Sequence, residues 1–162
     1  MKQIVLISLL SIIAFSCSQP VSYLDVDQFL DDWHKAAADA DFNAYFSKMD
    51  TDAIYLGTQY DERWTKQEFA TYAKPYFDRG RAWDFSAIDR HHYSSEDNQL
   101  IWFEETLKTW VGVCRGSGVI RNYGDSLRII HYNLAVTISN DLVHDFVELV
   151  KKDSVNSFLL EN

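Results

Sequence analysis

Apolar residues recur at steps of three and four in the first part of the chain, a spacing that places them on one face of an α-helix. The members of this set are Val26, Phe29, Leu30, Trp33, Ala36, Ala37 and Ala40. They predict an amphipathic helix at 24–40, followed by a short helix at 41–49 and a strand at 53–57. The run Thr65-Lys66-Gln67-Glu68 has the form of a capping box, so we expect a third helix at 66–78.

From residue 82 onward the apolar positions alternate with a period of two, which is typical of half-buried β-strands. The predicted strands are 82–93, 99–110, 113–122 and 126–138, and a closing helix is expected at 142–152. A helical half followed by antiparallel neighbouring strands indicates the α+β class. A long curved sheet folded over three helices leaves a cone with an open mouth, the kind of concave place in which pockets form.

The first seventeen residues have the features of an export signal. Lys2 precedes an apolar run from Ile4 to Phe15. This run is about a dozen residues long, whereas a membrane-spanning helix needs about twenty, so a signal peptide is indicated. The end of the run, Ala14-Phe15-Ser16-Cys17, resembles the lipobox of bacterial lipoproteins, whose cysteine is lipidated and becomes the new N-terminus. A buried N-terminal helix and a signal that is cleaved without acylation are the alternatives.

This pattern divides the chain into one domain and three accessory segments. The predicted segments are a signal peptide at 1–17, a tether at 18–23, the domain at 24–155 and a tail at 156–162. We expect export to the bacterial cell envelope and a lipid anchor at Cys17, on the periplasmic side of a membrane or on the outer surface. Cys114 is then left alone, and a buried apolar role is favoured over a nucleophilic one.

The composition narrows the classes of partner. The formal net charge is −9, and it becomes −10 when Lys2 leaves with the signal. Such an acidic chain argues against nucleic acid, whose binding needs a basic surface, and against direct adsorption to anionic lipid. Trp, Tyr and Phe make up 24 of the 162 residues, so the chain can fill a core and also line a cavity with rings. We expect no cofactor and a small, partly apolar ligand.

Three stretches of the sequence carry a family resemblance. They read Leu-Ile-Trp-Phe-Glu-Glu-Thr-Leu at 100–107, Arg-Gly-Ser-Gly-Val-Ile at 115–120 and Ile-Ile-His-Tyr-Asn-Leu-Ala at 129–135. Together with Tyr55-Leu56-Gly57-Thr58, this series resembles the SnoaL-like group of the NTF2-like (cystatin-like) cone fold. The resemblance implies a curved antiparallel sheet wrapped over three helices. It also implies a homodimer, because proteins of that fold commonly form one. Relatives include isomerases, dehydratases, cyclases and purely structural domains, so fold alone does not settle an activity.

The strands also supply candidate pocket residues, because alternate residues of a strand face opposite sides of the sheet. If the strands are neighbours in register, one face presents six polar or aromatic side chains. These are Trp102, Glu104, Arg115, Ser117, His131 and Asn133. We expect this face to line the cone. The expected aromatic walls are Trp33, Tyr55, Trp64 and Trp83. Such a pocket suits a ligand with an apolar body and one anionic or carbonyl end.

Catalysis is one role for this face. His131 or Glu104 could move a proton next to a carbonyl, while Arg115 or Asn133 holds the developing oxyanion. The structural alternative pairs Arg115 with Glu104 or Glu105 as an ion pair and makes His131 a hydrogen-bonded core residue.

Two further motifs have structural explanations. Gly116 and Gly118 favour close packing or a β-bulge over a phosphate-binding loop. His91 and His92 are adjacent in a strand and point to opposite faces, so we predict no metal site. The sequence leaves three functions open: a ligand-binding module, an enzyme of the lyase or isomerase type, and a structural homodimerisation domain.

Overall fold

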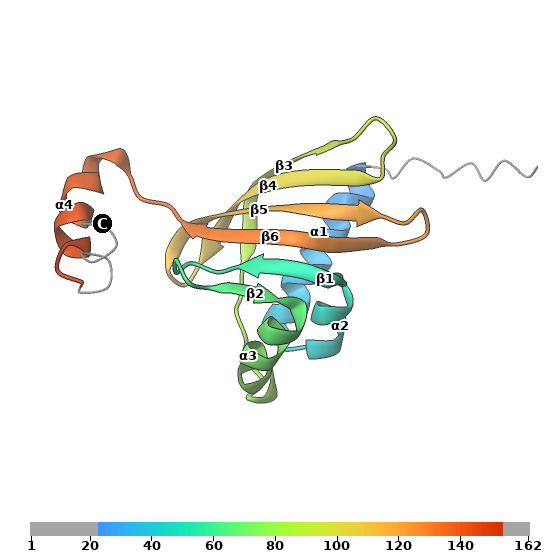
Figure 1. Ribbon diagram of the computed structural model, residues 1–162, viewed down its shortest axis with the longest axis horizontal. Coiled ribbons are helices and arrows are strands. Elements are labelled where there is room, and N and C mark those ends of the chain that lie inside the picture. Colours follow the sequence, from blue (N-terminus) through green and yellow to red (C-terminus); the bar gives the residue numbers. More distant parts are fainter. Residues whose placement is uncertain (1–22, 154–162) are drawn as a thin grey trace, which may run out of the picture.

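Every helix and strand predicted above is present in the computed structural model, which describes residues 23–153 (Figure 1). The elements are α1 Tyr23–Ala38, α2 Phe42–Ser47, β1 Met49–Leu56, β2 Arg63–Thr65, α3 Lys66–Asp78, β3 Ser86–Ser94, β4 Leu100–Thr109, β5 Gly112–Asn122, β6 Leu127–Val136, the 3₁₀ turn η1 Asn140–Leu142 and α4 Val143–Val150. Strand β2 is an addition, because three residues are too few to show a period. The predicted signal and Cys17 lie outside the described residues.

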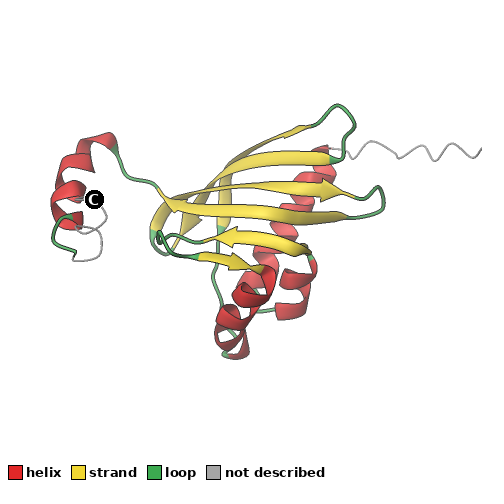
Figure 2. Cartoon of the chain, viewed as in Figure 1, coloured by secondary structure: helices red, strands yellow, loops and turns green. Residues whose placement is uncertain are grey.

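The six strands form one curved sheet in the order β2-β1-β6-β5-β4-β3. Strands β3 to β6 follow one another as antiparallel neighbours, which confirms the predicted meander. Strand β1 joins β6 in parallel, and β2 pairs with β1 in the antiparallel sense at the edge. Figure 2 shows helices α1, α2 and α3 gathered against this sheet. The α+β class is therefore confirmed.

Helix α3 begins at the predicted capping box. The Glu68 amide donates a hydrogen bond to the Thr65 hydroxyl at 3.3 Å, and the Thr65 amide donates to the Glu68 carboxylate at 2.8 Å. These reciprocal bonds satisfy two N–H groups that the start of a helix leaves without partners. The buried face of the helix, formed by Phe69, Ala73 and Phe77, then joins the core.

Aromatic rings fill the space between the helices and the sheet. The Trp33 ring stacks on Tyr45 with centroids 4.9 Å apart, and it meets Tyr132 edge to face at 4.8 Å. These are the arrangements that the ring quadrupoles favour. Trp33 is 1 % exposed, so it is a core residue, and its predicted place in a ligand wall is wrong. Cys114 is buried as well, as predicted for a small apolar side chain.

The last helix stands apart from the sheet. Figure 1 shows α4 beyond the end of β6, and none of its residues is buried. It follows η1, at whose start the Asp141 amide donates to the Ser139 hydroxyl at 3.4 Å. Within residues 23–153, no helix combines the length and the apolar character that crossing a bilayer requires.

Candidate functional site

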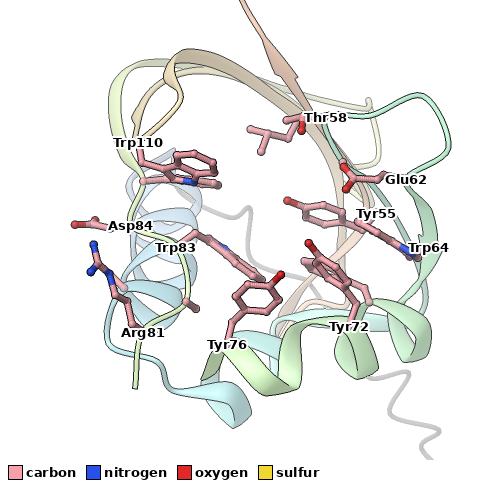
Figure 3. Close-up of a pocket in the computed structure, with 16 residues that line it drawn as sticks. Tyr55, Thr58, Glu62, Trp64, Tyr72, Tyr76, Arg81, Trp83, Asp84 and Trp110 are labelled. Atoms are coloured by element: carbon pink, nitrogen blue, oxygen red, sulfur yellow. The ribbon is translucent and has the colours of Figure 1, made fainter. Parts of the chain in front are cut away.

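A pocket of about 570 Å³ opens where β1 ends and the β4–β5 hairpin turns (Figure 3). Eight aromatic side chains line it: Tyr55, Trp64, Phe69, Tyr72, Tyr76, Trp83, Phe85 and Trp110. Small-molecule sites usually enclose roughly 300–1,000 Å³ and are lined mainly by apolar and aromatic groups. The mouth of the cone therefore has the size and the lining of a ligand site.

The wall of the pocket is built from adjacent elements. Tyr55 on β1 lies opposite Trp64 on β2, and helix α3 begins directly after β2. The helix turns Phe69, Tyr72 and Tyr76 toward the pocket, because residues three, four and seven apart share one helix face. The ring centroids of Tyr55 and Phe69 lie 3.9 Å apart, and those of Trp64 and Tyr72 lie 4.8 Å apart. Stacking holds these rings in place without help from a ligand.

Three tyrosine hydroxyls give the aromatic wall a polar character. Figure 3 shows the hydroxyls of Tyr55, Tyr72 and Tyr76 directed into the pocket. A hydrogen bond with Tyr76, aided by partial burial, raises the pKa of Tyr72 to about 12. Burial, and to a lesser degree the charge of Glu62, raises the pKa of Tyr55 well above its ordinary value. Both hydroxyls therefore stay protonated at neutral pH and are available for hydrogen bonds.

The charged groups of the pocket are mostly negative. The half-buried Glu62 carboxylate is fixed by the Gln59 amide, which donates to its Oε2 at 3.1 Å. Asp84 adds a second carboxylate, and the exposed Arg81 supplies the single cation of the lining residues. Two negative groups against one positive group make the pocket unfavourable for the anionic ligand end that the sequence suggested.

The pocket runs from a buried floor to an exposed rim. At the floor, Trp83 stacks on Phe69 with ring centroids 5.6 Å apart. At the rim, Trp110 is 83 % exposed on the β4–β5 hairpin. An indole left so exposed beside a cavity provides apolar contact area for whatever enters.

Comparison with known proteins identifies the family. The SnoaL-like domain matches residues 26–139, which is most of the chain. The protein belongs to the SnoaL-like domain family. No curated protein matches the sequence of this SnoaL-like protein.

Solved structures similar to this SnoaL-like protein have the NTF2-like or cystatin-like fold. An NTF2-like protein of unknown function from Pseudomonas putida has a TM-score of 0.61 at 11 % identity, over 73 % of this chain and 88 % of its own. A cystatin-like protein of unknown function from Nostoc punctiforme has a TM-score of 0.60 at 13 % identity, over 77 % of this chain and 100 % of its own. A candidate ketosteroid isomerase from Parabacteroides distasonis has a TM-score of 0.56 at 18 % identity, over 70 % of this chain and 86 % of its own. At these identities the similarity establishes the fold, and it confirms the NTF2-like prediction.

The strand residues expected to line the cone do share one face of the SnoaL-like domain. The register places Glu104 opposite Ser117, and Ser117 opposite Asn133. That face is the outer one, because Trp102 is 45 % exposed and both Glu104 and Arg115 are exposed. The inward-facing residues of β4 are instead Ile101, Phe103, Glu105 and Leu107.

The expected interior position is therefore wrong for the whole set of Trp102, Glu104, Arg115, Ser117, His131 and Asn133. Alternation along a strand shows which residues share a face, but it does not show which face the helices will cover. Among the expected aromatic walls, Tyr55, Trp64 and Trp83 do line the pocket. The acid–base candidates His131 and Glu104 lie outside it, as does Arg115.

A buried ionic network occupies the interior of this SnoaL-like domain. The Glu105 carboxylate, 2 % exposed, accepts hydrogen bonds from His34 at 2.8 Å, from Tyr132 at 3.2 Å and from Arg90 at 3.0 Å. Arg90 also pairs with Asp31 at 2.9 Å. Burial acts to raise the pKa of Glu105, but the hydrogen bond from His34 and the charge of Arg90 hold it below its ordinary value. The expected ion pair of Glu105 with Arg115 is thus replaced by a pair with Arg90.

Gly116 has the close-packing role that the sequence suggested. A methyl group in its place would meet the Glu105 Oε1 atom at 2.9 Å and would also collide with the Tyr132 hydroxyl. Gly118 is equally confined, since a methyl group there would lie 2.8 Å from the Phe103 ring. These glycines leave room for the buried network and for the core ring.

Several residues of the site were missed by the sequence reasoning. The buried role of Glu105 had a signal, because it shares its face with Phe103 and Leu107, whereas Glu104 shares its face with Lys108. Glu62 and Trp110 had no comparable signal. They lie in a loop and a hairpin, and only the folded sheet places them beside the same cavity.

Proposed function

We propose that this SnoaL-like protein is a binding module for a small ligand with an apolar, ring-containing body and a polar end that donates hydrogen bonds. The observation that carries the proposal is the pocket of about 570 Å³ with aromatic walls and the Glu62 carboxylate among its lining residues. A protonated amine or a hydroxyl group fits such an end. The aromatic faces favour a cation by about 0.5–2 kcal/mol, and the partly buried Glu62 carboxylate favours it further.

A panel of ring-bearing amines, alcohols and carboxylic acids of matched size tests this function by thermal shift and calorimetry. We expect the amines and alcohols to stabilise the protein and the acids to have little effect. A ligand at a hundred times its dissociation constant adds about 2.7 kcal/mol to the free energy of unfolding.

The matched variants are Glu62→Gln and Glu96→Gln, the second at an exposed glutamate that does not line the pocket. Glu62→Gln is expected to weaken amine binding about tenfold, since the lost charge-assisted hydrogen bond contributes about 1.5–3 kcal/mol, while Glu96→Gln leaves it unchanged. Tighter binding of the acids, or no stabilisation by any compound, would contradict the proposal.

A second candidate function is an enzyme of the lyase or isomerase type. The same pocket offers Glu62 as a base and the hydroxyls of Tyr55 and Tyr72 as donors to a carbonyl oxygen. One of the structurally similar proteins is a candidate ketosteroid isomerase, and this supports an enzymatic role as the alternative. Deuterium exchange next to the carbonyl of cyclic ketones, followed by NMR, tests it. Exchange that Glu62→Gln does not slow would exclude this role for Glu62.

We also propose that the protein is exported to the bacterial cell envelope and held there by an acyl group on Cys17. The short apolar run and the lipobox-like end of the signal support this location. Acylated Cys17 is expected to carry the protein into the detergent phase on phase partitioning. Cys17→Ala should move it to the aqueous phase, and a variant that still fractionates with membranes would contradict the anchor.

A further inference from the structure

A second pocket, of about 540 Å³, lies at the opposite end of the sheet from the aromatic mouth. It is bounded by α1, by the junction between α2 and β1, and by the β5–β6 hairpin. Strand β1 begins near this pocket and ends near the aromatic one, so the two cavities are separated by the length of a strand. Figure 1 places the β5–β6 hairpin and the start of α1 at this end.

Two cations of this otherwise acidic protein line the second pocket. The Lys48 ammonium lies 4.5 Å from the centre of the Phe29 ring and 3.6 Å from the Asp32 carboxylate, and the Lys48 side chain is 20 % exposed. Arg128 donates from Nη1 to the Leu127 carbonyl at 2.7 Å. Among residues 23–153, Arg128 forms no ion pair, so most of the five N–H groups of its guanidinium are left for another acceptor.

A third cation, Lys66, does not line the pocket but interacts electrostatically with Arg128. The Lys66 ammonium donates to the Met49 carbonyl at 2.8 Å and is partly buried. Burial lowers the pKa of both Lys48 and Lys66; the charge of Asp32 on Lys48 and of Asp50 on Lys66 opposes this shift, and the charge of Arg128 adds to it in both cases. Fixed positive charges repel one another where water is limited, so an anion between them would stabilise the arrangement.

The carboxylates near this end neutralise the cluster only in part. The Asp32 side chain is half exposed, and its Oδ2 atom lies 3.6 Å from the Lys48 ammonium, which is longer than a hydrogen bond. Asp50 is engaged by Tyr123 at 2.6 Å and by Arg121 at 3.5 Å. Asp125, on the rim, accepts a hydrogen bond from Ser126 at 3.1 Å. None of the three carboxylates forms an ion pair with Arg128.

We propose that this pocket binds a phosphate group between the Lys48 ammonium and the Arg128 guanidinium. A guanidinium binds two phosphate oxygens side by side, and an ammonium supplies a compact charge to a third. The pocket has room for a phosphate ester, either a small soluble one or the headgroup of a phospholipid. This site is independent of the aromatic pocket and of the ligand proposed for it.

The position of the pocket points to a phospholipid headgroup as one source of the phosphate group, and this step rests on the anchor proposed at Cys17. Gln28 and Phe29, which line it, lie in the second turn of α1, close to the point where the chain from Cys17 enters the domain. An anchored chain would hold this end of the domain near the membrane surface.

The experiment uses the full chain with Cys17→Ala, so that acylation does not contribute. Inorganic phosphate and glycerol phosphate are titrated by calorimetry at constant ionic strength against chloride. Vesicles of phosphatidylglycerol and of phosphatidylcholine are used in co-sedimentation. Arg128→Gln and Lys48→Gln are compared with Lys108→Gln, which removes an exposed cation on β4 that does not line the pocket. Circular dichroism verifies that each variant is folded.

We expect Arg128→Gln and Lys48→Gln each to weaken binding at least tenfold and Lys108→Gln to leave it unchanged. Binding of the soluble phosphates identifies a soluble ester as ligand, whereas binding to phosphatidylglycerol vesicles alone identifies a headgroup. Absence of binding to every probe overturns the site, as does binding that Arg128→Gln and Lys48→Gln leave unchanged.

Discussion

The His34 ring donates a hydrogen bond from Nε2 to the Glu105 carboxylate at 2.8 Å, across 71 residues of the chain and inside the core. The bond connects helix α1 to strand β4, and Arg90 on β3 completes the pairing from the neighbouring strand. The buried network thus connects the helical layer to the sheet, while the aromatic pocket lies at the mouth of the cone.

Removing the buried carboxylate is expected to be costly. Glu105→Gln leaves Arg90 with its charge only partly compensated, and breaking a buried pair in this way costs about 3–5 kcal/mol of stability. Glu104→Gln, at the adjacent exposed position, should change the free energy of unfolding by less than about 0.5 kcal/mol. Urea denaturation of both variants measures the difference. Equal effects would show that the network does not stabilise the fold.

The same carboxylate predicts a dependence of stability on pH. The pKa of Glu105 is lowered in the folded protein, so its contribution is fully present above the unfolded pKa of about 4.3 and is lost as pH falls through the folded pKa. The stability difference between the wild type and Glu105→Gln should therefore be constant from neutral pH down to about pH 5, and shrink below it. Urea denaturation from pH 7 to pH 3 tests this. A stability difference between the wild type and Glu105→Gln that grows as the pH falls would contradict a lowered pKa of Glu105.

Gly116→Ala is expected to destabilise the domain by about 1–3 kcal/mol, because the added methyl group overpacks the space beside Glu105 and Tyr132. Tyr132→Phe removes the hydroxyl that the methyl group would meet. In a double-mutant cycle, the two changes should therefore cost less together than the sum of their separate effects. The free energies of unfolding are measured by thermal and urea denaturation. Strictly additive effects of the two substitutions would show that the methyl group is not strained against the Tyr132 hydroxyl.

The outer face of the sheet is the surface that we propose for a homodimer. Trp102, 45 % exposed, stacks on Tyr93 with ring centroids 6.1 Å apart. Such an exposed aromatic pair is typical of the centre of an interface. Trp102→Glu is expected to raise the dimer dissociation constant at least tenfold in sedimentation velocity experiments.

Trp110→Glu is the matched control for this surface, since Trp110 is exposed at the pocket rim and not on the outer face. It should leave the dimer intact while weakening ligand binding. A wild-type protein that stays monomeric at high concentration would contradict the proposed dimer.

Much of the architecture could be read from local sequence. The change of period at residue 82 and the capping box at Thr65 predicted the type and order of the elements, because each depends on neighbours a few residues away. The alternation in β4 also showed correctly that Trp102 and Glu104 share a face. Within residues 23–153, the three-residue elements β2 and η1 were not predicted, since neither is long enough to show a pattern.

The site depended on contacts that no local pattern contains. The apolar neighbours Phe103 and Leu107 favoured the face of Glu105 as the buried one, but the side of the sheet that the helices cover decided it. The sequence by itself determined an acidic chain, the secondary structure elements and the resemblance to an NTF2-like cone, and it predicts an export signal. The tertiary structure decided which residues meet, because Glu62, Tyr72 and Trp110 come from separate segments that only the closing of the cone brings to one cavity.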